Sequence, residues 1–395
     1  KSSDRGDLLE SRASGRRGVF PEVDPRSRAW VEIDAGALRR NYDRIALGLP
    51  DGCRVIPMVK ADGYGLGMTR VVDALADAGP WGWGVATPSE GEELRRHGVR
   101  APIVVFSPLP PGCEGRVVAA GLTPSVSDPD TLLRLAAAAA GPLPVHLEID
   151  TGMGRAGLRW DQVEEWGATI RERLVSPLRW EGVYTLFHSA DEDGGPGVEE
   201  QLRRFSRVLA VLDPPMEVIR HVQNTAGALR LSPERHSFGL ARPGIGLYGG
   251  GSGPDLPTPE PVVAARARVT RVVDVAAGST LGYGATYSAS GPDRWATLAI
   301  GYGDGYRRTA SNRASVLVSG RRVPVVGRVS MDVTVVNITG LNGVRPGNVV
   351  TLLGRDGEGE IRLDELAGWM GTIAYEVLTG FTPRLPRVWL PTSSD

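Results

Sequence analysis

The chain has 395 residues, enough for two well-buried domains, and its 41% hydrophobic and 23% charged residues are typical of a soluble globular protein. The formal net charge is −1 and no long basic run occurs, so neither nucleic acid nor a membrane surface is an expected partner. The two cysteines lie in no CxxC or His/Cys cluster, which argues against a disulfide framework and a metal site and predicts a reducing, cytoplasmic location.

The first 28 residues are polar and lack the apolar core of a signal peptide, so we expect a flexible tail there. The chain starts with lysine instead of methionine, which leaves open whether a preceding segment has been removed. From residue 29 onward, short β-rich runs alternate with amphipathic helical stretches. Helices are expected at Ala35–Leu47, Val163–Arg173 and Glu199–Leu212, where apolar residues recur on one face.

The repeated order of strand and helix predicts parallel strands with right-handed crossovers. About eight such units lie within residues 29–255, which is the size of a TIM-type (β/α)₈ barrel. In chain order, the expected strands are WVEID, RVIPMVK, WGWGVAT, PIVVFS, LTPSVS, PVHLEID, WEGVYTLF, HVQN and a last one near Leu240.

A different pattern follows the Gly/Pro-rich stretch GGGSGPDLPTPEP at residues 249–261, which predicts a linker. Beyond it, alternating strands are separated by turn signals such as LNG and RDG. This predicts a mostly antiparallel β domain over residues 256–395, with one helix at Leu363–Met370. The expected fold class is therefore α/β, with an N-terminal barrel followed by a smaller C-terminal β domain.

Lys60 ends the apolar strand RVIPMV and directly precedes the loop ADGYGLG. In a parallel barrel, catalytic groups lie at the C-terminal ends of the strands. Apolar neighbours lower the pKa of an ammonium group and make the neutral amine a competent imine-forming nucleophile. Arginine is used almost everywhere else in this chain, and arginine cannot form a Schiff base. By position alone, a surface lysine that ends a strand is an equally good interpretation.

Seven segments, taken together, favour the imine-forming role of Lys60. They are VKADGYGLG, DTGMGRAG, RPGIGLYG, GYGATY, GYGDGY, GRVSMD and IAYEVLTGFTPRLPRVW. In this order they resemble the alanine racemase family, from about Trp30 to Leu390. The resemblance implies a barrel followed by a β domain, pyridoxal 5'-phosphate (PLP) as cofactor and a small amino acid as substrate. It also implies interconversion of L- and D-alanine by a homodimer whose active site is shared across the interface.

The resemblance implies that Lys60 and Tyr283 are the catalytic residues. Lys60 would carry PLP as a Schiff base and exchange a proton with one face of the substrate carbon. Tyr283 of the other subunit would serve the opposite face, because racemisation requires a proton to leave one face and return to the other. A tyrosine ordinarily titrates near 10, so Tyr283 would need activation by its neighbours. Without the resemblance, a packing tyrosine is the better interpretation of Tyr283.

The resemblance also implies residues that bind the cofactor and the substrate. Arg242 would face the pyridine nitrogen, to which a permanently charged donor cannot give up a proton. The phosphate would lie against Tyr64, Thr225, the backbone of Gly244 and Ile245, and Tyr375. The substrate carboxylate would bind Arg155 and the backbone N–H of Met331 from the partner subunit. An access corridor would be lined by Tyr302, Arg308, Arg328 and Asp191, which could otherwise be solvated charges or ordinary packing residues.

Two positions depart from the family pattern. Glu148 replaces a lysine, often carbamylated, whose negative charge positions the substrate-binding arginine, and we expect a Glu148–Arg155 pair to keep that role. Leu186 replaces a histidine that links the cofactor's arginine to the catalytic tyrosine. His188 lies two residues further on, on the same face about 7 Å away if the strand continues, and is a candidate substitute.

These departures leave alternatives open. The leading one is a PLP-dependent alanine racemase. The second is a diverged racemase, or another PLP enzyme of Cα chemistry, acting on a different amino acid. The third is a non-catalytic cofactor-binding protein, which the presence of both Tyr283 and Arg155 argues against.

Overall fold

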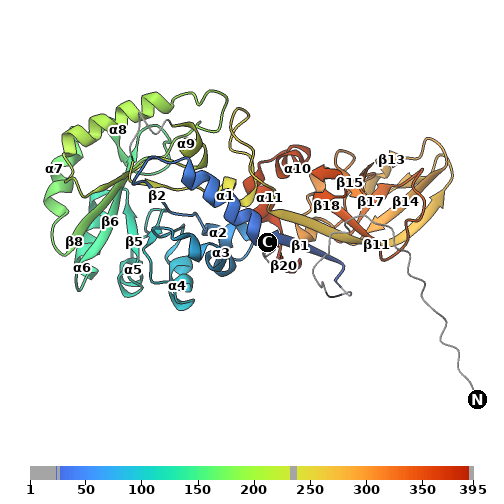
Figure 1. Cartoon of the computed structure of the whole chain (residues 1–395), viewed down its shortest axis with the longest axis horizontal. Helices are drawn as coiled ribbons and strands as arrows, with labels where there is room; N and C mark the ends of the chain where they lie inside the picture. Colours follow the sequence, from blue (N-terminus) through green and yellow to red (C-terminus); the bar gives the residue numbers. More distant parts are fainter. Residues whose placement is uncertain (1–23, 25–26, 232–237, 391–395) are drawn as a thin grey trace, which may run out of the picture.

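The computed structural model describes residue 24, residues 27–231 and residues 238–390. It has two halves that lie next to each other, a barrel and a β domain (Figure 1). The tail predicted for residues 1–28 lies mostly outside the described residues. Within these ranges, we find no helix that has both the length and the apolar character needed to cross a membrane.

Eight parallel strands form the barrel, which confirms the predicted architecture. They are β2 Arg54–Val55, β3 Trp83–Val85, β4 Ile103–Val105, β5 Thr123–Val126, β6 Leu143–Asp150, β8 Leu178–Tyr184, β9 Ile219–His221 and β10 Leu240–Ala241, with β7 Leu158–Arg159 added beside β6. Strands β3 to β9 form one sheet, and β10 pairs with β2. Backbone bridges from Met58 to Gly84 and from Gln223 to Ala241 close the ring between these two sheets.

Helices connect the barrel strands and lie around them (Figure 1). The helices predicted at Ala35–Leu47 and Val163–Arg173 are confirmed, and the one predicted at Glu199–Leu212 begins one residue earlier. The first helix starts where Oδ1 of Asp34 accepts the N–H of Ala37 at 2.8 Å, a typical N-cap. The helices are α1 Ala35–Leu47, α2 Lys60–Gly65, α3 Met68–Leu75, α4 Pro88–Arg96, α5 Glu114–Ala119, α6 Pro129–Ala138, α7 Val163–Arg173, α8 Val198–Leu212 and α9 Thr225–Arg230.

The prediction that WVEID opens the barrel is wrong. This strand, β1 (Ala29–Asp34), pairs antiparallel with β11 (Val263–Val275) and parallel with β20 (Arg387–Leu390), so it belongs to the sheet of the β domain. Five of its six residues are buried, and a strand buried on both faces has no periodicity that identifies its sheet. Its partners lie more than 200 residues away in the chain, where local sequence carries no information about them.

The β domain is a mostly antiparallel sheet built around β11, which confirms the second half of the predicted fold. The helix predicted at Leu363–Met370 is α10, and α11 (Ala374–Gly380) follows it. The remaining strands are β12 Thr280–Leu281, β13 Tyr287–Ser288, β14 Asp293–Leu298, β15 Ser315–Val318, β16 Arg321–Pro324, β17 Thr334–Asn337, β18 Val349–Asp356 and β19 Gly359–Ile361.

Helix α11 brings the end of the chain to the barrel. At Gly65, the last residue of α2, an added Cβ would lie only 2.7 Å from the carbonyl oxygen of Leu378. The carbonyl of Gly65 also accepts a hydrogen bond of 3.0 Å from Nε of Arg387. The first contact holds α11, and the second holds β20, against the segment that follows Lys60, and Tyr375 of α11 lies near Tyr64 of that segment.

Candidate active site

Lys60 lies directly after the bridge from Met58 to β3, at the C-terminal end of a barrel strand, as predicted. Burial lowers the pKa of its ammonium group, and the nearby guanidinium of Arg155 lowers it further, while Glu90 acts in the opposite direction. The neutral amine is therefore populated at lower pH than in an ordinary lysine. A neutral, partly buried amine is the form that attacks an aldehyde.

The residues after Lys60 adopt an unusual left-handed turn. Ala61, Asp62 and Tyr64 have φ angles of 52°, 55° and 56°, and Gly63 between them has 61°. Left-handed geometry costs roughly 1–2 kcal/mol for each residue that carries a Cβ. The turn is held at both ends, because Glu90 Oε1 accepts the N–H of Ala61 and Asp62 Oδ1 accepts the N–H of Met68, each at 2.7 Å. Such strain is common where a catalytic group must be held in place.

Sequence reasoning missed Glu90, although the T-x-x-E pattern at Thr87 signals a helix N-terminus. The other carboxylate oxygen, Oε2, accepts the N–H groups of Ala86 and Thr87 at 2.7 and 3.0 Å. The pattern predicts that α4 begins there, and the structure confirms it. Only the tertiary structure brings the same carboxylate to the turn after Lys60.

We expect the substitution Glu90→Ala to lower the free energy of unfolding by about 1–3 kcal/mol, because three backbone N–H groups lose a charged acceptor. Denaturant titration of the purified protein measures this change. Glu93, exposed on the same helix, supplies the matched control, and Glu93→Ala should stay within about 0.5 kcal/mol of the parent. Equal stability of the two variants would contradict a role of Glu90 in holding the turn.

The five residues predicted to hold a phosphate lie near one another. The ring of Tyr64 lies 6.0 Å from that of Tyr375, and Gly244 N–H donates to Oγ1 of Thr225 at 2.9 Å. A side chain on Gly244 would collide with the Tyr64 hydroxyl, and Ile245 follows, fully buried. The site thus combines three hydroxyl groups with a backbone that only glycine permits, which suits a small anion.

Tyr248 is a further member of this group that sequence reasoning did not assign. Its ring stacks on Tyr64 with 4.4 Å between the ring centroids, and its hydroxyl donates to the carbonyl of Met58 at 2.8 Å. Tyr64 therefore contacts two aromatic rings, those of Tyr248 and Tyr375, in the turn that follows Lys60. The only available signal was the position of Tyr248 within RPGIGLYG, six residues after Arg242.

Arg242 is almost fully buried, with 5% of its surface exposed. Its Nη1 donates to Nδ1 of His221 at 2.6 Å and its Nη2 to the carbonyl of Thr185 at 2.8 Å. Burial lowers the pKa of Arg242 to about 10, so the guanidinium is still charged at neutral pH. The charge lies 4.9 Å from the centre of the Tyr184 ring, in a cation–π arrangement.

The expected Glu148–Arg155 ion pair is absent from the described part of the protomer. Glu148 is 6% exposed and its Oε2 accepts from Oγ of Ser127 at 2.9 Å, whereas Arg155 is exposed on the loop after β6. Burial raises the pKa of Glu148, and the nearby Arg155 works against that shift. Glu148 and Arg155 therefore interact electrostatically, although Glu148 is buried and Arg155 is exposed.

Leu186 and His188 do not re-create the family's histidine link within one protomer. The backbone carbonyl of Leu186 accepts from Nε2 of Gln201 at 3.0 Å, and its side chain offers no polar atom. Nδ1 of His188 lies 2.6 Å from Oγ of its neighbour Ser189. The partners that the structure gives Arg242 are instead His221 and the Thr185 backbone.

Tyr283 and Met331 stand apart from this group. They are exposed to 70% and 52%, respectively, although both are large and apolar in most of their surface. Tyr283 precedes β13, which lies at the end of the β domain far from the barrel (Figure 1). One protomer therefore does not bring Tyr283 and Lys60 together.

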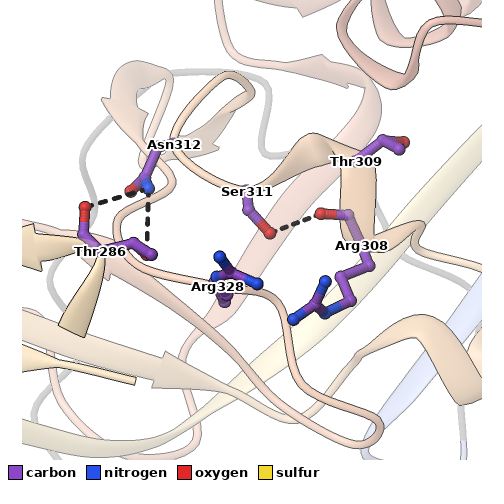
Figure 2. Close-up of a pocket in the computed structure, with 6 residues that line it drawn as sticks. All are labelled: Thr286, Arg308, Thr309, Ser311, Asn312 and Arg328. Carbon is purple, nitrogen blue, oxygen red and sulfur yellow. Dashed lines mark hydrogen bonds between the residues drawn. The ribbon is translucent and has the colours of Figure 1, made fainter. Parts of the chain in front are cut away.

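A polar pocket of about 370 Å³ lies beside the Tyr283 turn. Two of the predicted corridor residues, Arg308 and Arg328, extend their guanidinium groups into it (Figure 2). An added Cβ on Gly284 would lie 3.9 Å from Nε of Arg328, which shows how close the turn and this arginine are. The other corridor residues, Tyr302 and Asp191, do not line this pocket.

Asp191 affects Tyr375 at the barrel. Burial raises the pKa of the Tyr375 hydroxyl to about 12, and the nearby carboxylates of Asp191 and Asp364 raise it as well. The hydroxyl therefore keeps its proton at neutral pH and can donate it to a bound anion. Among the described residues, we find no group of three or more His, Cys, Asp or Glu side chains arranged to hold a metal ion.

Sequence comparisons identify both halves of the chain. Residues 33–252 match the model of the alanine racemase N-terminal domain, and residues 262–389 match that of the C-terminal domain. The alanine racemase of Symbiobacterium thermophilum is 39% identical over 376 residues, which cover 93% of this chain and 98% of the relative. That of Geobacter sulfurreducens is 36% identical over 92% of this chain and 97% of its own length.

Solved structures of the same family resemble this one closely. Alanine racemase from the D-cycloserine producer Streptomyces lavendulae has a TM-score of 0.86 at 33% identity, covering 92% of this chain and 97% of that protein. Alanine racemase from Bartonella henselae, solved with covalently bound pyridoxal phosphate, has a TM-score of 0.84 at 28% identity. It covers 92% of this chain and 100% of that protein.

Proposed function

This chain belongs to the alanine racemase family, and from that premise we propose that Lys60 and Tyr283 of two protomers together interconvert L- and D-alanine. The protein is a PLP-dependent isomerase of alanine. The assignment of individual residues to this reaction is our proposal, and it is supported by the chemistry of the side chains around Lys60.

The side chains around Lys60 suit PLP. The observation that supports this fit is the backbone at Gly244, where no side chain fits beside the Tyr64 hydroxyl. Tyr64, Thr225, Gly244, Ile245 and Tyr375 would hold the phosphate, while Arg242 would face the ring nitrogen. When bound, PLP supplies an electron sink that makes the Cα proton of the amino acid acidic.

Lys60 has two tasks in this proposal. Its amine, with a pKa lowered by burial and by Arg155, would anchor the cofactor covalently. Once released by the incoming amino acid, the same amine would exchange a proton with one face of Cα. Arg155, exposed beside it, would bind the substrate carboxylate and so orient Cα toward Lys60.

The opposite face of Cα requires a second base. Tyr283 is 70% exposed on the β domain and remote from Lys60 of its own chain, so we propose that it serves the partner's site in a homodimer. Met331, also exposed, would bring its N–H to the same site and bind the substrate carboxylate. This exposure of Tyr283 and Met331 is the observation that carries the dimer proposal.

Complementation between two inactive variants tests the shared site. A dimer that combines one Lys60→Ala chain with one Tyr283→Phe chain has one site with both lesions and one with none. Random mixing makes about half of the dimers mixed, so we expect roughly one quarter of the parent activity to return. Racemisation of alanine, measured before and after refolding the two variants together, shows this gain.

Mixing each variant with itself is the control and should restore nothing. No regain in the mixed sample, with dimers present by light scattering, would place both bases on the same chain and contradict the proposal. We also propose a cytoplasmic location, in keeping with two unpaired cysteines. Finally, we propose a division of the chain into domains at residues 29–255 and 256–395, with β1 pairing in the second domain's sheet.

A further inference from the structure

Arg242 ends a buried chain of four hydrogen-bonded side chains. Nη1 of Arg242 lies 2.6 Å from Nδ1 of His221, and Nε2 of His221 lies 2.9 Å from Nδ1 of His146. Nε2 of His146 in turn lies 3.3 Å from Oε2 of Glu181. The members come from β9, β6 and β8 and from the residue that follows β10, so only the closed barrel brings them together.

The strand between the two histidines leaves room for this contact. Gly182 of β8 is paired with His146 of β6, and an added Cβ at Gly182 would lie 2.7 Å from Nδ1 and Cε1 of the imidazole. Any larger residue would therefore displace the ring that joins Glu181 to His221. On the other side, the Tyr184 ring stacks on His221 with 4.9 Å between the centroids.

The proton positions along this chain follow from Arg242. A guanidinium group can only donate, so Nδ1 of His221 must accept and the proton of His221 lies on Nε2. That proton is donated to Nδ1 of His146, which leaves the His146 proton on Nε2, facing Glu181. Burial lowers the pKa of both histidines, in keeping with one proton on each ring. All three hydrogen bonds thus point from Arg242 toward the carboxylate.

Glu181 is suited to be the acceptor at the end of the chain. Its second oxygen, Oε1, accepts from Nη2 of Arg179 at 2.7 Å. Although burial acts in the opposite direction, the hydrogen bonds from His146 and Arg179 hold the pKa of Glu181 below its ordinary value. The carboxylate is therefore ionised at neutral pH and attracts the His146 N–H.

We propose that Glu181 is a positioning residue that accepts the N–H of His146, holds the two imidazole rings in place and so holds the guanidinium of Arg242 in place. This rests on the proposed placement of Arg242 at the ring nitrogen of PLP. These hydrogen-bonded side chains matter for Arg242 because Leu186 replaces the family's histidine, and a leucine side chain cannot hydrogen-bond to Arg242. Orientation of the guanidinium then depends on His221 and on the carbonyl of Thr185.

The test uses the PLP-loaded enzyme with ¹⁵N-labelled histidine. The chain has five histidines, and His97→Gln, His188→Gln and His236→Gln variants assign three of them, which leaves the resonances of His146 and His221. In the parent, His221 is expected to show one tautomer, protonated on Nε2. Glu181→Leu removes the acceptor of the His146 N–H, so the Nε2 resonance of His146 should move, while Arg242 keeps the proton of His221 on Nε2. We expect kcat to fall on the order of ten-fold with KM nearly unchanged, as when a partner that orients a functional imidazole is lost.

Two variants complete the comparison. Glu181→Gln keeps the shape and an acceptor oxygen, so it should restore most of kcat. Glu217, exposed just before β9, supplies the matched control Glu217→Leu, which should leave both readouts unchanged. If Glu181→Leu does not fold, the Nε2 resonance of His146 must still move in Glu181→Gln while His97 and His188 stay constant.

Distinct results overturn this proposal and the one on which it rests. An unmoved Nε2 resonance of His146 in Glu181→Leu or Glu181→Gln, or unchanged kcat in Glu181→Leu, would overturn the positioning role. A wrong placement of Arg242 would appear separately, as unchanged kcat in Arg242→Gln. The resonance of His146 does not depend on what the guanidinium faces.

Discussion

The substitution Lys60→Arg should abolish racemisation, with kcat falling on the order of 10³-fold or more, as when an essential nucleophile is removed. Arginine keeps the positive charge but cannot form a Schiff base with PLP, and its pKa is too high for it to act as a base. Both proposed tasks of Lys60 are therefore lost in one change. Chiral chromatography of alanine over time measures the activity, and absorbance above 400 nm shows whether the covalent link still forms.

The composition of the chain makes this prediction unusually easy to check. Lysine occurs at only two positions, Lys1 and Lys60. Borohydride reduction followed by peptide mapping should place the cofactor on Lys60 alone, and Lys1→Arg is the matched control that keeps full activity. Retained activity in Lys60→Arg, or a label on Lys1, would contradict the assignment of Lys60 as the anchor.

The substitution Tyr283→Phe is expected to lower kcat by about 10²–10⁴-fold, the usual contribution of a general acid–base group. KM should change little, because the aromatic ring and its packing remain. Lys60 would still exchange the Cα proton on its own face, so in deuterated water one enantiomer of alanine should gain deuterium without inversion. Proton NMR of the recovered alanine, separated by enantiomer, distinguishes exchange from inversion.

Tyr287→Phe is the matched control for Tyr283→Phe. Tyr287 lies four residues further on, where its hydroxyl donates to Oδ2 of Asp293 at 2.8 Å, a contact within the β domain. Its replacement should leave kcat within about two-fold of the parent, with at most a modest loss of stability. Deuterium incorporation into both enantiomers by Tyr283→Phe would show that the second base is another residue.

The positions of helices were predictable because the signals are local. The cap at Asp34 and the apolar face that follows define Ala35–Leu47 from 14 consecutive residues, and α10 is found in the same way. Lys60 was likewise predictable, since its place at the end of an apolar strand and its motif lie within a few residues. Strand WVEID was assigned to the wrong sheet because its pairing with β11 and β20 is a long-range property.

In the candidate site, too, local motifs were predictable and long-range contacts were not. Motifs identified Tyr64, Thr225, Gly244 and Arg242 one by one, and the structure brings them together with Lys60 at the barrel. Sequence alone gave no reason to join Glu90 to Ala61, or Glu181 to Arg242 through two histidines. Those contacts depend on which strands become neighbours when the barrel closes.

By itself, the sequence predicted the family and most of the order of strands and helices, because each is encoded in short segments with strong local chemistry. The assignment of Lys60 as the cofactor lysine stays a prediction. The tertiary structure determines which charged and polar side chains come into contact. It separates the carboxylate of Glu148 from Arg155 by depth and gives Arg242 a buried partner in His221. It also leaves Tyr283 exposed, far from Lys60 of the same chain. The physical reason is that burial and hydrogen bonding arise between segments distant in sequence, and they are fixed only when the chain closes on itself.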